Sequence, residues 1–248
     1  MDASEAEHIR TPNRVRIIIK DCRMSLTSSL IQCSSLSKRF KLDSETLTIL
    51  RDINLTIKPG KTIAIIGPSG SGKTTLLSVL AGLESHSEGE LHLFGMSSLS
   101  LTDQQRSDLR LQKMGFVFQD FKLLPHFTAH ENVSLPLELL SAENASSRAT
   151  EWLNKVGLSH RLESFPTTLS GGEKQRVAIA RAFITNPKVV FADEPTGNLD
   201  AKKAVEITDV LWDHHREQGT SLIIATHDSA VAARCNEQYK LINGKLII

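Results

Sequence analysis

The segment Gly67–Thr74 reads GPSGSGKT and matches the phosphate-binding pattern G-x-x-x-x-G-K-[ST]. In such a loop, glycines let backbone N–H groups face phosphate oxygens, and the start of the following helix adds its positive dipole end. Lys73 can reach the β- and γ-phosphates, and the Thr74 hydroxyl can bind Mg²⁺. An apolar run over 62–66 precedes the loop and a helical pattern over 73–81 follows it. This strand–loop–helix context favours a phosphate site over a plain glycine-rich turn.

Two carboxylates, Asp193 and Glu194, follow the apolar run Val189–Ala192. The end of a buried strand is where a nucleotide-bound Mg²⁺ needs an outer ligand, so we expect Asp193 to hold the ion through water. Glu194 is one residue further and could take a proton from an attacking water molecule. A solvated strand end or a helix cap would also place two acids here. The presence of a phosphate loop in the same chain favours the catalytic interpretation.

A second glycine-lined helix start occurs at Leu169–Arg176, which reads LSGGEKQR. The Ser170 hydroxyl and the backbone of Gly171 and Gly172 could bind a second anion. Ser170 and Glu173 also have the spacing of a capping box, which needs no ligand. The residues alone leave both interpretations open.

Taken together, these segments resemble the ATP-binding-cassette (ABC) ATPases, whose signature is LSGGQ; Glu173 stands where that consensus ends in Gln. The resemblance covers approximately residues 31–248. Four further positions match family motifs: Gln119 in the Q-loop, Asp200 in the D-loop (Asn198–Asp200), His227 as the switch histidine, and Phe40 where a tyrosine usually stacks on adenine.

The resemblance implies a head-to-tail dimer that binds two ATP molecules with Mg²⁺, each between the P-loop of one subunit and Ser170–Gly172 of the other. The implied catalytic residues are Glu194 as the activator of water, His227 at the γ-phosphate, Gln119 and Lys73. Asp200 would link the two sites, and the implied Mg²⁺ ligands are Thr74, Gln119 and, through water, Asp193. The implied ATP-binding residues are Phe40, Gly67, Pro68, Ser69, Gly70, Ser71, Gly72, Lys73, Thr74 and Thr75, with Ser170, Gly171 and Gly172 of the other subunit.

A finer resemblance lies in EPTGNLD at 194–200, in GFVFQ at 115–119 and in the tail over 232–245. These are similar to the branch of lipoprotein-release, macrolide-export and cell-division ABC ATPases (LolD, MacB, FtsE), and within it most similar to the YbbA type. That branch implies a separate transmembrane permease, with export or extraction of hydrophobic, lipid-like cargo or with mechanotransmission.

The expected permease contact lies near the Q-loop, where Leu123, Leu124 and Phe127 form a hydrophobic patch. His126 and His130 in the same stretch have the spacing of a metal pair, but no further ligand follows at a suitable spacing, so we expect partner contact rather than a metal.

The elements that must position these residues can also be read from the pattern. The runs 62–66, 189–192 and 222–225 lack polar alternation and indicate strands buried on both faces of a parallel sheet. Residues 90–95 alternate and indicate a half-buried strand, and 115–119 forms another short strand. Helical spacing covers 73–81 and 173–184.

The expected fold is therefore α/β: a P-loop NTPase (RecA-like) parallel-sheet core, with an N-terminal antiparallel β subdomain and an α-helical subdomain inserted at about 102–184. Residues 1–30 form a polar extension. We expect residues 1–23 to be dispensable, because a second methionine, Met24, follows them.

Composition restricts the class of protein. The 248 residues carry 29 Lys and Arg against 28 Asp and Glu, so the net charge of +1 gives no footprint for nucleic acid. No apolar run approaches the roughly 18–20 residues that span a bilayer. Cys22, Cys33 and Cys235 form no CxxC pair, which indicates free thiols in a reducing compartment. Together with this composition, the resemblance to ABC ATPases implies a cytoplasmic protein held at the inner face of the plasma membrane by its permease.

Two other functions compete with this one. A soluble ABC ATPase of DNA repair or translation usually adds tandem cassettes, coiled coils, zinc modules or basic linkers, and this sequence has none of them. A small P-loop kinase would need neither Ser170–Gly172 nor the pair Gln119 and His227.

Overall fold

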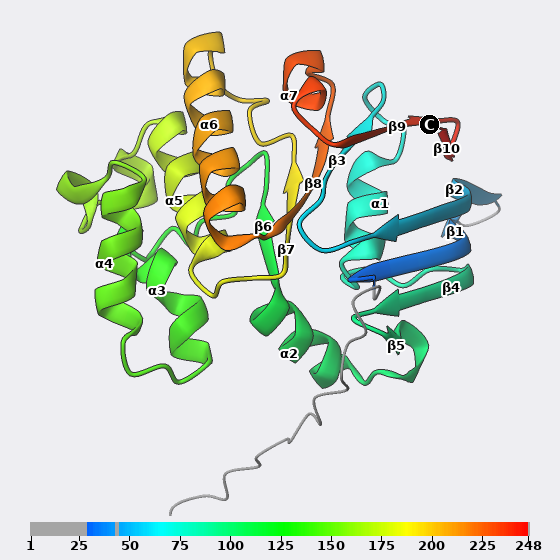
Figure 1. Ribbon diagram of the computed structural model, residues 1–248, viewed down its shortest axis with the longest axis horizontal. Coiled ribbons are helices and arrows are strands. Elements are labelled where there is room, and N and C mark those ends of the chain that lie inside the picture. The colour runs from blue at the N-terminus through cyan, green and yellow to red at the C-terminus, as the bar shows by residue number, and fades with distance from the viewer. Residues whose placement is uncertain (1–28, 43–44, 248) are drawn as a thin grey trace, which may run out of the picture.

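The computed structural model describes residues 29–42 and 45–247, which form two sheets with helices packed against them (Figure 1). The predicted α/β core with an antiparallel β subdomain is confirmed. The expectation for residues 1–23, and nearly all of the extension over 1–30, lies outside the described residues.

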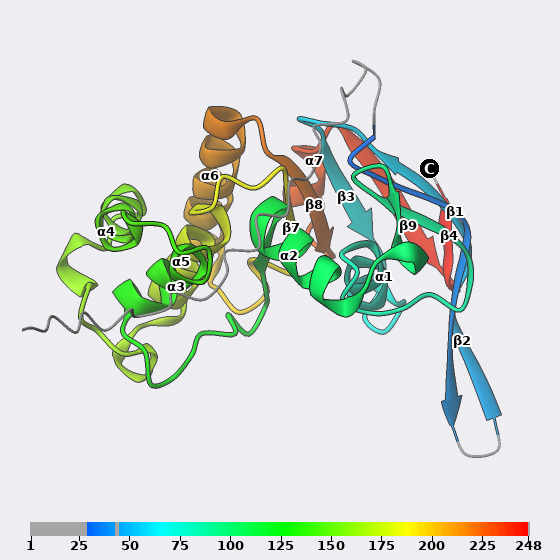
Figure 2. The ribbon, with the colours of Figure 1, turned by 90° about the horizontal axis from the view of Figure 1, so that it is seen from below.

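The smaller sheet is antiparallel and has the strand order β2-β1-β4-β5. Its long hairpin projects beyond the sheet in Figure 2. Alternate residues of the second hairpin strand, such as Ile53, Leu55 and Ile57, are buried, so one face of this sheet packs against the core. The strands are β1 (Ile31–Leu42), β2 (Glu45–Ile57), β4 (Glu88–Leu93) and β5 (Met96–Ser97).

The larger sheet has the order β10-β9-β3-β8-β7-β6, and five of its strands are parallel while β10 runs antiparallel to β9. Both faces are buried: Phe191 and Ile223 face the smaller sheet, whereas their neighbours Ala192 and Ile224 face the opposite layer of helices. The strands are β3 (Thr62–Ile66), β6 (Met114–Val117), β7 (Val189–Asp193), β8 (Ser221–Thr226), β9 (Glu237–Ile242) and β10 (Lys245–Ile247).

Helices cover this sheet on both sides, as expected for strands without polar alternation. Helix α1 (Lys73–Leu80) packs between the two sheets, where Leu76 and Leu80 are fully buried. Helix α5 (Gly171–Phe183) packs on β6. The remaining helices near the core are α2 (Asp103–Lys113), α6 (Ala201–Gln218) and α7 (Ser229–Ala233).

A helical lobe extends from one end of the core (Figure 1). It contains α3 (Ala129–Leu139), α4 (Ala145–Lys155), which both contact α5, and short 3₁₀ turns at Ser159–Arg161 and Pro166–Thr168. Strand β6 lies inside the stretch 102–184 but belongs to the large sheet, so the chain leaves the core for the lobe only after Val117. Of the helices in the described residues, none combines the length and the apolar character that crossing a membrane requires.

Candidate functional site

The glycine-rich loop connects β3 to α1, and its glycines are required by space and by backbone conformation. Gly70 and Gly72 have φ values of +77° and +99°, a region that other residues rarely adopt. A Cβ on Gly67 would lie 2.7 Å from both the Ser71 hydroxyl and the Leu241 carbonyl oxygen. The backbone therefore forms a tight cradle at the N-terminus of α1, where N–H groups and the helix dipole favour an anion.

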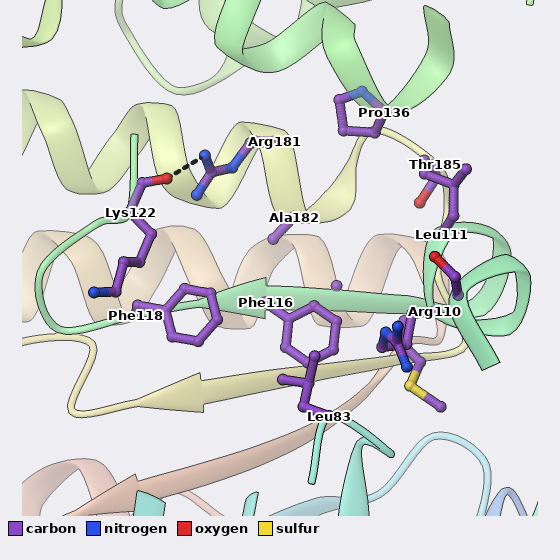
Figure 3. A pocket seen from close by; sticks show the side chains of 13 residues that line it. Leu83, Arg110, Leu111, Phe116, Phe118, Lys122, Pro136, Arg181, Ala182 and Thr185 are labelled. Atoms are coloured by element: carbon purple, nitrogen blue, oxygen red, sulfur yellow. Dashed lines mark hydrogen bonds between the residues drawn. The ribbon is translucent and has the colours of Figure 1, made fainter. Parts of the chain in front are cut away.

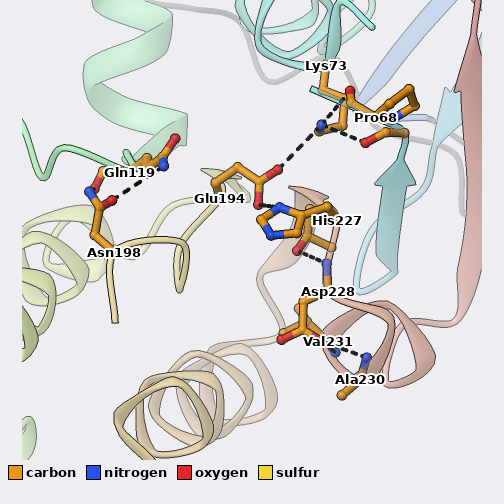
Figure 4. A network of polar contacts seen from close by, with 11 residues as sticks. Pro68, Lys73, Gln119, Glu194, Asn198, His227, Asp228, Ala230 and Val231 are labelled. Carbon is orange, nitrogen blue, oxygen red and sulfur yellow. Dashed lines mark hydrogen bonds and ion pairs between the residues drawn. The ribbon is translucent and has the colours of Figure 1, made fainter. Parts of the chain in front are cut away.

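Lys73 begins α1 and bends back over this cradle. Its Nζ donates to the carbonyl oxygens of Gly67 at 2.9 Å and Pro68 at 3.2 Å, and lies 3.4 Å from Oε1 of Glu194 (Figure 4). The side chain is only 8% exposed. A nearly buried ammonium is thus held at the loop by two dipoles and one carboxylate.

Glu194 connects this lysine to the histidine at the end of β8. Its Oε2 lies 2.9 Å from Nδ1 of His227, so one carboxylate contacts both the lysine and the histidine (Figure 4). The Glu194 backbone has φ +45°, and its N–H donates to the Ala225 carbonyl at 2.9 Å. A non-glycine residue in this left-handed region costs about 1–2 kcal/mol, and such strain concentrates at functional sites.

Asp193 is the last residue of β7 and points into the same space. Burial raises the pKa of its carboxyl group, and the neighbouring charge of Glu194 raises it further, while a hydrogen bond from Thr74 acts in the opposite direction. Its Oδ1 is buried and has no hydrogen-bond partner. The same is true of the Ser71 hydroxyl oxygen. Orphaned buried oxygens are rare, and two of them beside a phosphate cradle fit a site that would take a magnesium ion and a phosphate group.

Gln119 lies two residues beyond the end of β6, so the strand expected over 115–119 is shorter than the pattern indicated. Asn198 fixes its backbone by donating from Nδ2 to the Gln119 carbonyl at 2.7 Å, and the two side chains meet at 3.5 Å (Figure 4). The turn after β6 thereby places the Gln119 amide at the edge of the phosphate site.

These side chains share one pocket of about 540 Å³, although they come from five separate segments of the chain. The sequence reasoning missed one member, Ile49, which lies against Gly72. The pocket is lined by Ile49, Ser69, Gly70, Gly72, Lys73, Thr74, Thr75, Gln119, Asp193, Glu194 and His227.

Phe40 is absent from this lining. It lies on β1, about one third of its surface is exposed, and the Lys38 ammonium lies 4.7 Å from the centre of its ring. One face of the ring is therefore covered by a cation within the same chain, and stacking of Phe40 on adenine stays a prediction.

The second glycine-lined helix start lies in a different hollow. Ser170 caps α5 in a capping box with Glu173, and Arg161 contacts the Glu173 carboxylate at 2.9 Å. The Ser170 backbone N–H and the Arg161 guanidinium lower the pKa of Glu173. Ser170 and Gly172 line a pocket of about 270 Å³ that shares no residue with the phosphate pocket. Within one chain, the hollow at Ser170–Gly172 and the phosphate pocket are thus separate.

Asp200 occupies the N-cap of α6, and its Oδ1 accepts a hydrogen bond from the Lys203 backbone N–H at 3.0 Å. The aliphatic part of the Lys203 side chain lies over Gly172, since a Cβ on that glycine would be 3.3 Å from it. Asp200 and the segment Ser170–Gly172 are therefore neighbours in this chain.

A third hollow of about 370 Å³ lies where the core meets the lobe (Figure 3). Apolar side chains such as Leu83, Phe116 and Phe118 line it together with Arg110, Lys122 and Arg181, and no acidic residue is among its lining. The sequence reasoning missed this groove because its residues come from distant segments.

The expected contact patch next to it is only partly exposed. Leu124 and Phe127 are exposed, whereas Leu123 packs against the core of the lobe. The expected partner contact of His126 and His130 stays a prediction; His130 is engaged within the chain, because its Nε2 lies 3.0 Å from the Ser146 carbonyl.

Comparison with known proteins gives concordant matches. The family model described as ABC transporter matches residues 50–197. The chain is 46% identical over 220 residues to the uncharacterized ABC transporter ATP-binding protein YbbA of Escherichia coli K12, covering 88% of this chain and 96% of YbbA. It is 44% identical to the lipoprotein-releasing system ATP-binding protein LolD of Francisella tularensis FSC 198, covering 88% and 95%.

Among solved structures, the chain resembles the ATP-binding cassette MJ0796 in a dimeric post-hydrolysis state bound to ADP and Pi. The TM-score is 0.81 at 37% sequence identity, and the match covers 87% of this chain and 96% of MJ0796. A second dimeric structure of MJ0796 matches at 38% identity with the same TM-score.

Proposed function

Because this chain belongs to the ABC transporter family of ATP-binding cassettes, we propose that it binds and hydrolyses ATP to drive a separate transmembrane permease. The observation that carries the proposal is the contact series Lys73–Glu194–His227 beside the phosphate cradle. A cation for phosphate, a carboxylate for water and a polar contact for the γ-phosphate are the components that phosphoryl transfer to water requires.

ATP binding rests on the loop and on residues around it. The cradle N–H groups and Lys73 hold the β- and γ-phosphates, while Thr74, Gln119 and Asp193 hold Mg²⁺, with Asp193 acting through water. The ion, when bound, neutralises phosphate charge that develops during transfer. The buried oxygen of Asp193 that lacks a partner supports this assignment.

The hydrolytic step rests on Glu194. Its carboxylate contacts both Lys73 and His227. Phosphate oxygens compete for the Lys73 ammonium, so binding of ATP releases Glu194 to accept a proton from the attacking water. His227 is then free to contact the γ-phosphate, and His227 and Gln119 together hold the reacting groups in position.

The second anion site supports a head-to-tail dimer. Ser170–Gly172 lies outside the phosphate pocket of its own subunit, since the two hollows share no residue. We place this segment on the ATP of a second subunit, with Asp200 linking the two sites. The relative MJ0796 is described as dimeric.

The permease is the proposed membrane partner, and it would hold the chain at the cytoplasmic face of the inner membrane. The apolar groove at the junction of core and lobe, with its three cations, supports docking there. By similarity to LolD, which is named for lipoprotein release, we propose lipid-like or otherwise hydrophobic cargo.

Two measurements test this proposal. The purified full chain should release phosphate from Mg-ATP, and a photo-crosslinker at Leu124 should capture a membrane-spanning protein from native membranes. The matched control is a crosslinker at Ile247, which is also exposed but lies on β10, at the opposite edge of the large sheet from β6. ATP hydrolysis without a membrane-spanning product would favour the soluble, non-transport alternative.

A further inference from the structure

Arg181 lies in the last turn of α5 and makes contacts that the proposed function does not use. Its Nη2 donates to the Phe121 carbonyl at 2.8 Å and its Nη1 to the Lys122 carbonyl at 2.7 Å, the latter drawn in Figure 3. Burial alone lowers the pKa of this guanidinium to about 10, with no contribution from a carboxylate. The desolvated guanidinium therefore donates to the carbonyl oxygens of two consecutive residues.

The segment that accepts these bonds is strained. Phe121 and Lys122 have φ values of +64° and +45°, so two consecutive non-glycine residues adopt the left-handed region. L-residues pay for this conformation in steric repulsion, and it persists only where the surroundings enforce it. The forked guanidinium fits that requirement, because charge-assisted hydrogen bonds are the stronger ones and two are made at once.

This turn directly follows Gln119, which faces the phosphate pocket. It also touches the other end of α5, since a Cβ on Gly171 would lie 4.0 Å from the Phe121 ring. One short turn thus contacts the helix at its first residue, inside the second anion site, and at Arg181 in its last turn.

We propose that Arg181 is a positioning residue for ATP hydrolysis, which holds the 120–122 turn so that Gln119 and the Ser170–Gly172 segment keep a fixed relation. The inference rests on the proposed function. Through this turn, Gln119 at the phosphate pocket is coupled to the two ends of α5. Loss of the clamp leaves ATP bound but misplaces Gln119, and small misplacements of catalytic groups cost large factors in rate.

The test is Arg181→Lys in the full chain. Lysine keeps the positive charge but cannot donate in the forked geometry to both carbonyls. We expect kcat to fall about tenfold or more and the Mg²⁺ concentration for half-maximal activity to rise. Affinity for a fluorescent ATP analogue should change less than about threefold, because the cradle is untouched.

The control is Arg148→Lys. Arg148 also donates to a carbonyl at the end of α5, that of Ile184 at 2.6 Å, but it does not touch the turn. We expect this variant to keep the wild-type kcat and Mg²⁺ dependence. A merely structural role for Arg181 would give both variants similar losses of melting temperature and activity.

A rescue variant tests the clamp itself. Glycine adopts positive φ without steric cost, so Lys122→Gly in the Arg181→Lys background should restore much of kcat. If Arg181→Lys alone unfolds at the assay temperature, the double variant is compared with the wild type in its place.

Unchanged kcat in Arg181→Lys, an equal loss in Arg148→Lys, or no recovery in the double variant would each overturn the inference. The wild-type chain reports on the proposed function in the same assay. If the wild type does not turn over ATP, the proposed function fails and the inference with it. If the wild type is active and Arg181→Lys is equally active, only the inference fails.

Discussion

Replacement of Glu194 by glutamine separates the two roles that its contacts support. The carboxylate lies 3.4 Å from the Lys73 ammonium and 2.9 Å from the His227 ring nitrogen, and its side chain is 12% exposed. Glutamine keeps the shape and can still accept a hydrogen bond from either partner. It has no charge and cannot take up a proton from water.

The size of each effect follows from these contacts. Loss of a general base lowers kcat by about 10²–10⁴-fold. Two charges 3.4 Å apart attract by about 5 kcal/mol at an effective dielectric constant of 20, much of it offset by desolvation. Lys73 retains the Gly67 and Pro68 carbonyls, so we expect the free energy of unfolding to fall by only about 1–3 kcal/mol.

The affinity for ATP should rise, whereas kcat and the free energy of unfolding should fall. Glu194 is paired with Lys73 and would repel an incoming phosphate, and glutamine removes both effects. We expect ATP to bind about tenfold more tightly, equivalent to about 1.4 kcal/mol, and the dimer to persist because ATP is not consumed.

Phosphate release, urea denaturation, a nucleotide titration and size-exclusion chromatography with ATP measure these four effects. Glu90→Gln, which replaces an exposed glutamate on β4, is the matched control and should match the wild type in all four. Turnover within about twofold of the wild type would refute Glu194 as the base. Weaker ATP binding would refute the competition for Lys73.

Three further predictions concern stability. Asp193→Asn should raise the melting temperature measured without nucleotide, because the charge of a desolvated carboxylate is removed. The same variant should lose the Mg²⁺-dependent part of stabilisation by ATP. A lower melting temperature without nucleotide would contradict this prediction. The Ser170 backbone N–H lowers the pKa of Glu173, so the carboxylate stabilises the fold above pH 4.5, the ordinary pKa. This contribution is lost as the pH falls through the lowered pKa. In urea denaturation from pH 3 to 7, the free energy of unfolding should therefore depend less on pH at the acid end in Glu173→Gln than in the wild type. Gly115→Ala should lower the free energy of unfolding by about 2 kcal/mol or more in urea, because its methyl group would overlap the Ala182 carbonyl oxygen, and an unchanged midpoint would show that β6 can shift away from α5.

The buried strands of the large sheet could be predicted from the sequence because their pattern is local. Residues 62–66 match β3 without a shift, and the runs at 189–192 and 222–225 fall within β7 and β8. A strand buried on both faces needs apolar residues at every position, and few other elements require that. The predicted strand over 115–119 ends at Val117 instead, because the chain must turn there to bring Gln119 to the pocket.

The parts that escaped prediction depend on contacts across the chain. The strained turn at Phe121 and Lys122 contains no glycine, so no local signal marks its left-handed backbone; only Arg181, some sixty residues away, accounts for it. The same holds for Glu194, whose positive φ is held by the Ala225 carbonyl of a neighbouring strand. Conformations that tertiary contacts enforce against local preference cannot be read from local pattern.

A common principle connects the groups that the proposed function assigns to ATP. Within the chain Lys73 is paired with Glu194, Glu173 with Arg161, and Asp200 with Lys203. Binding of ATP is then an exchange of ionic partners rather than the filling of a prepared cationic site. Such an exchange favours a ligand that carries enough negative charge to displace the Glu194 carboxylate from Lys73, which a triphosphate with its γ-group does better than a diphosphate. The Lys73–Glu194 pair thus couples release of the Glu194 carboxylate, the general base, to the presence of the γ-phosphate that is hydrolysed.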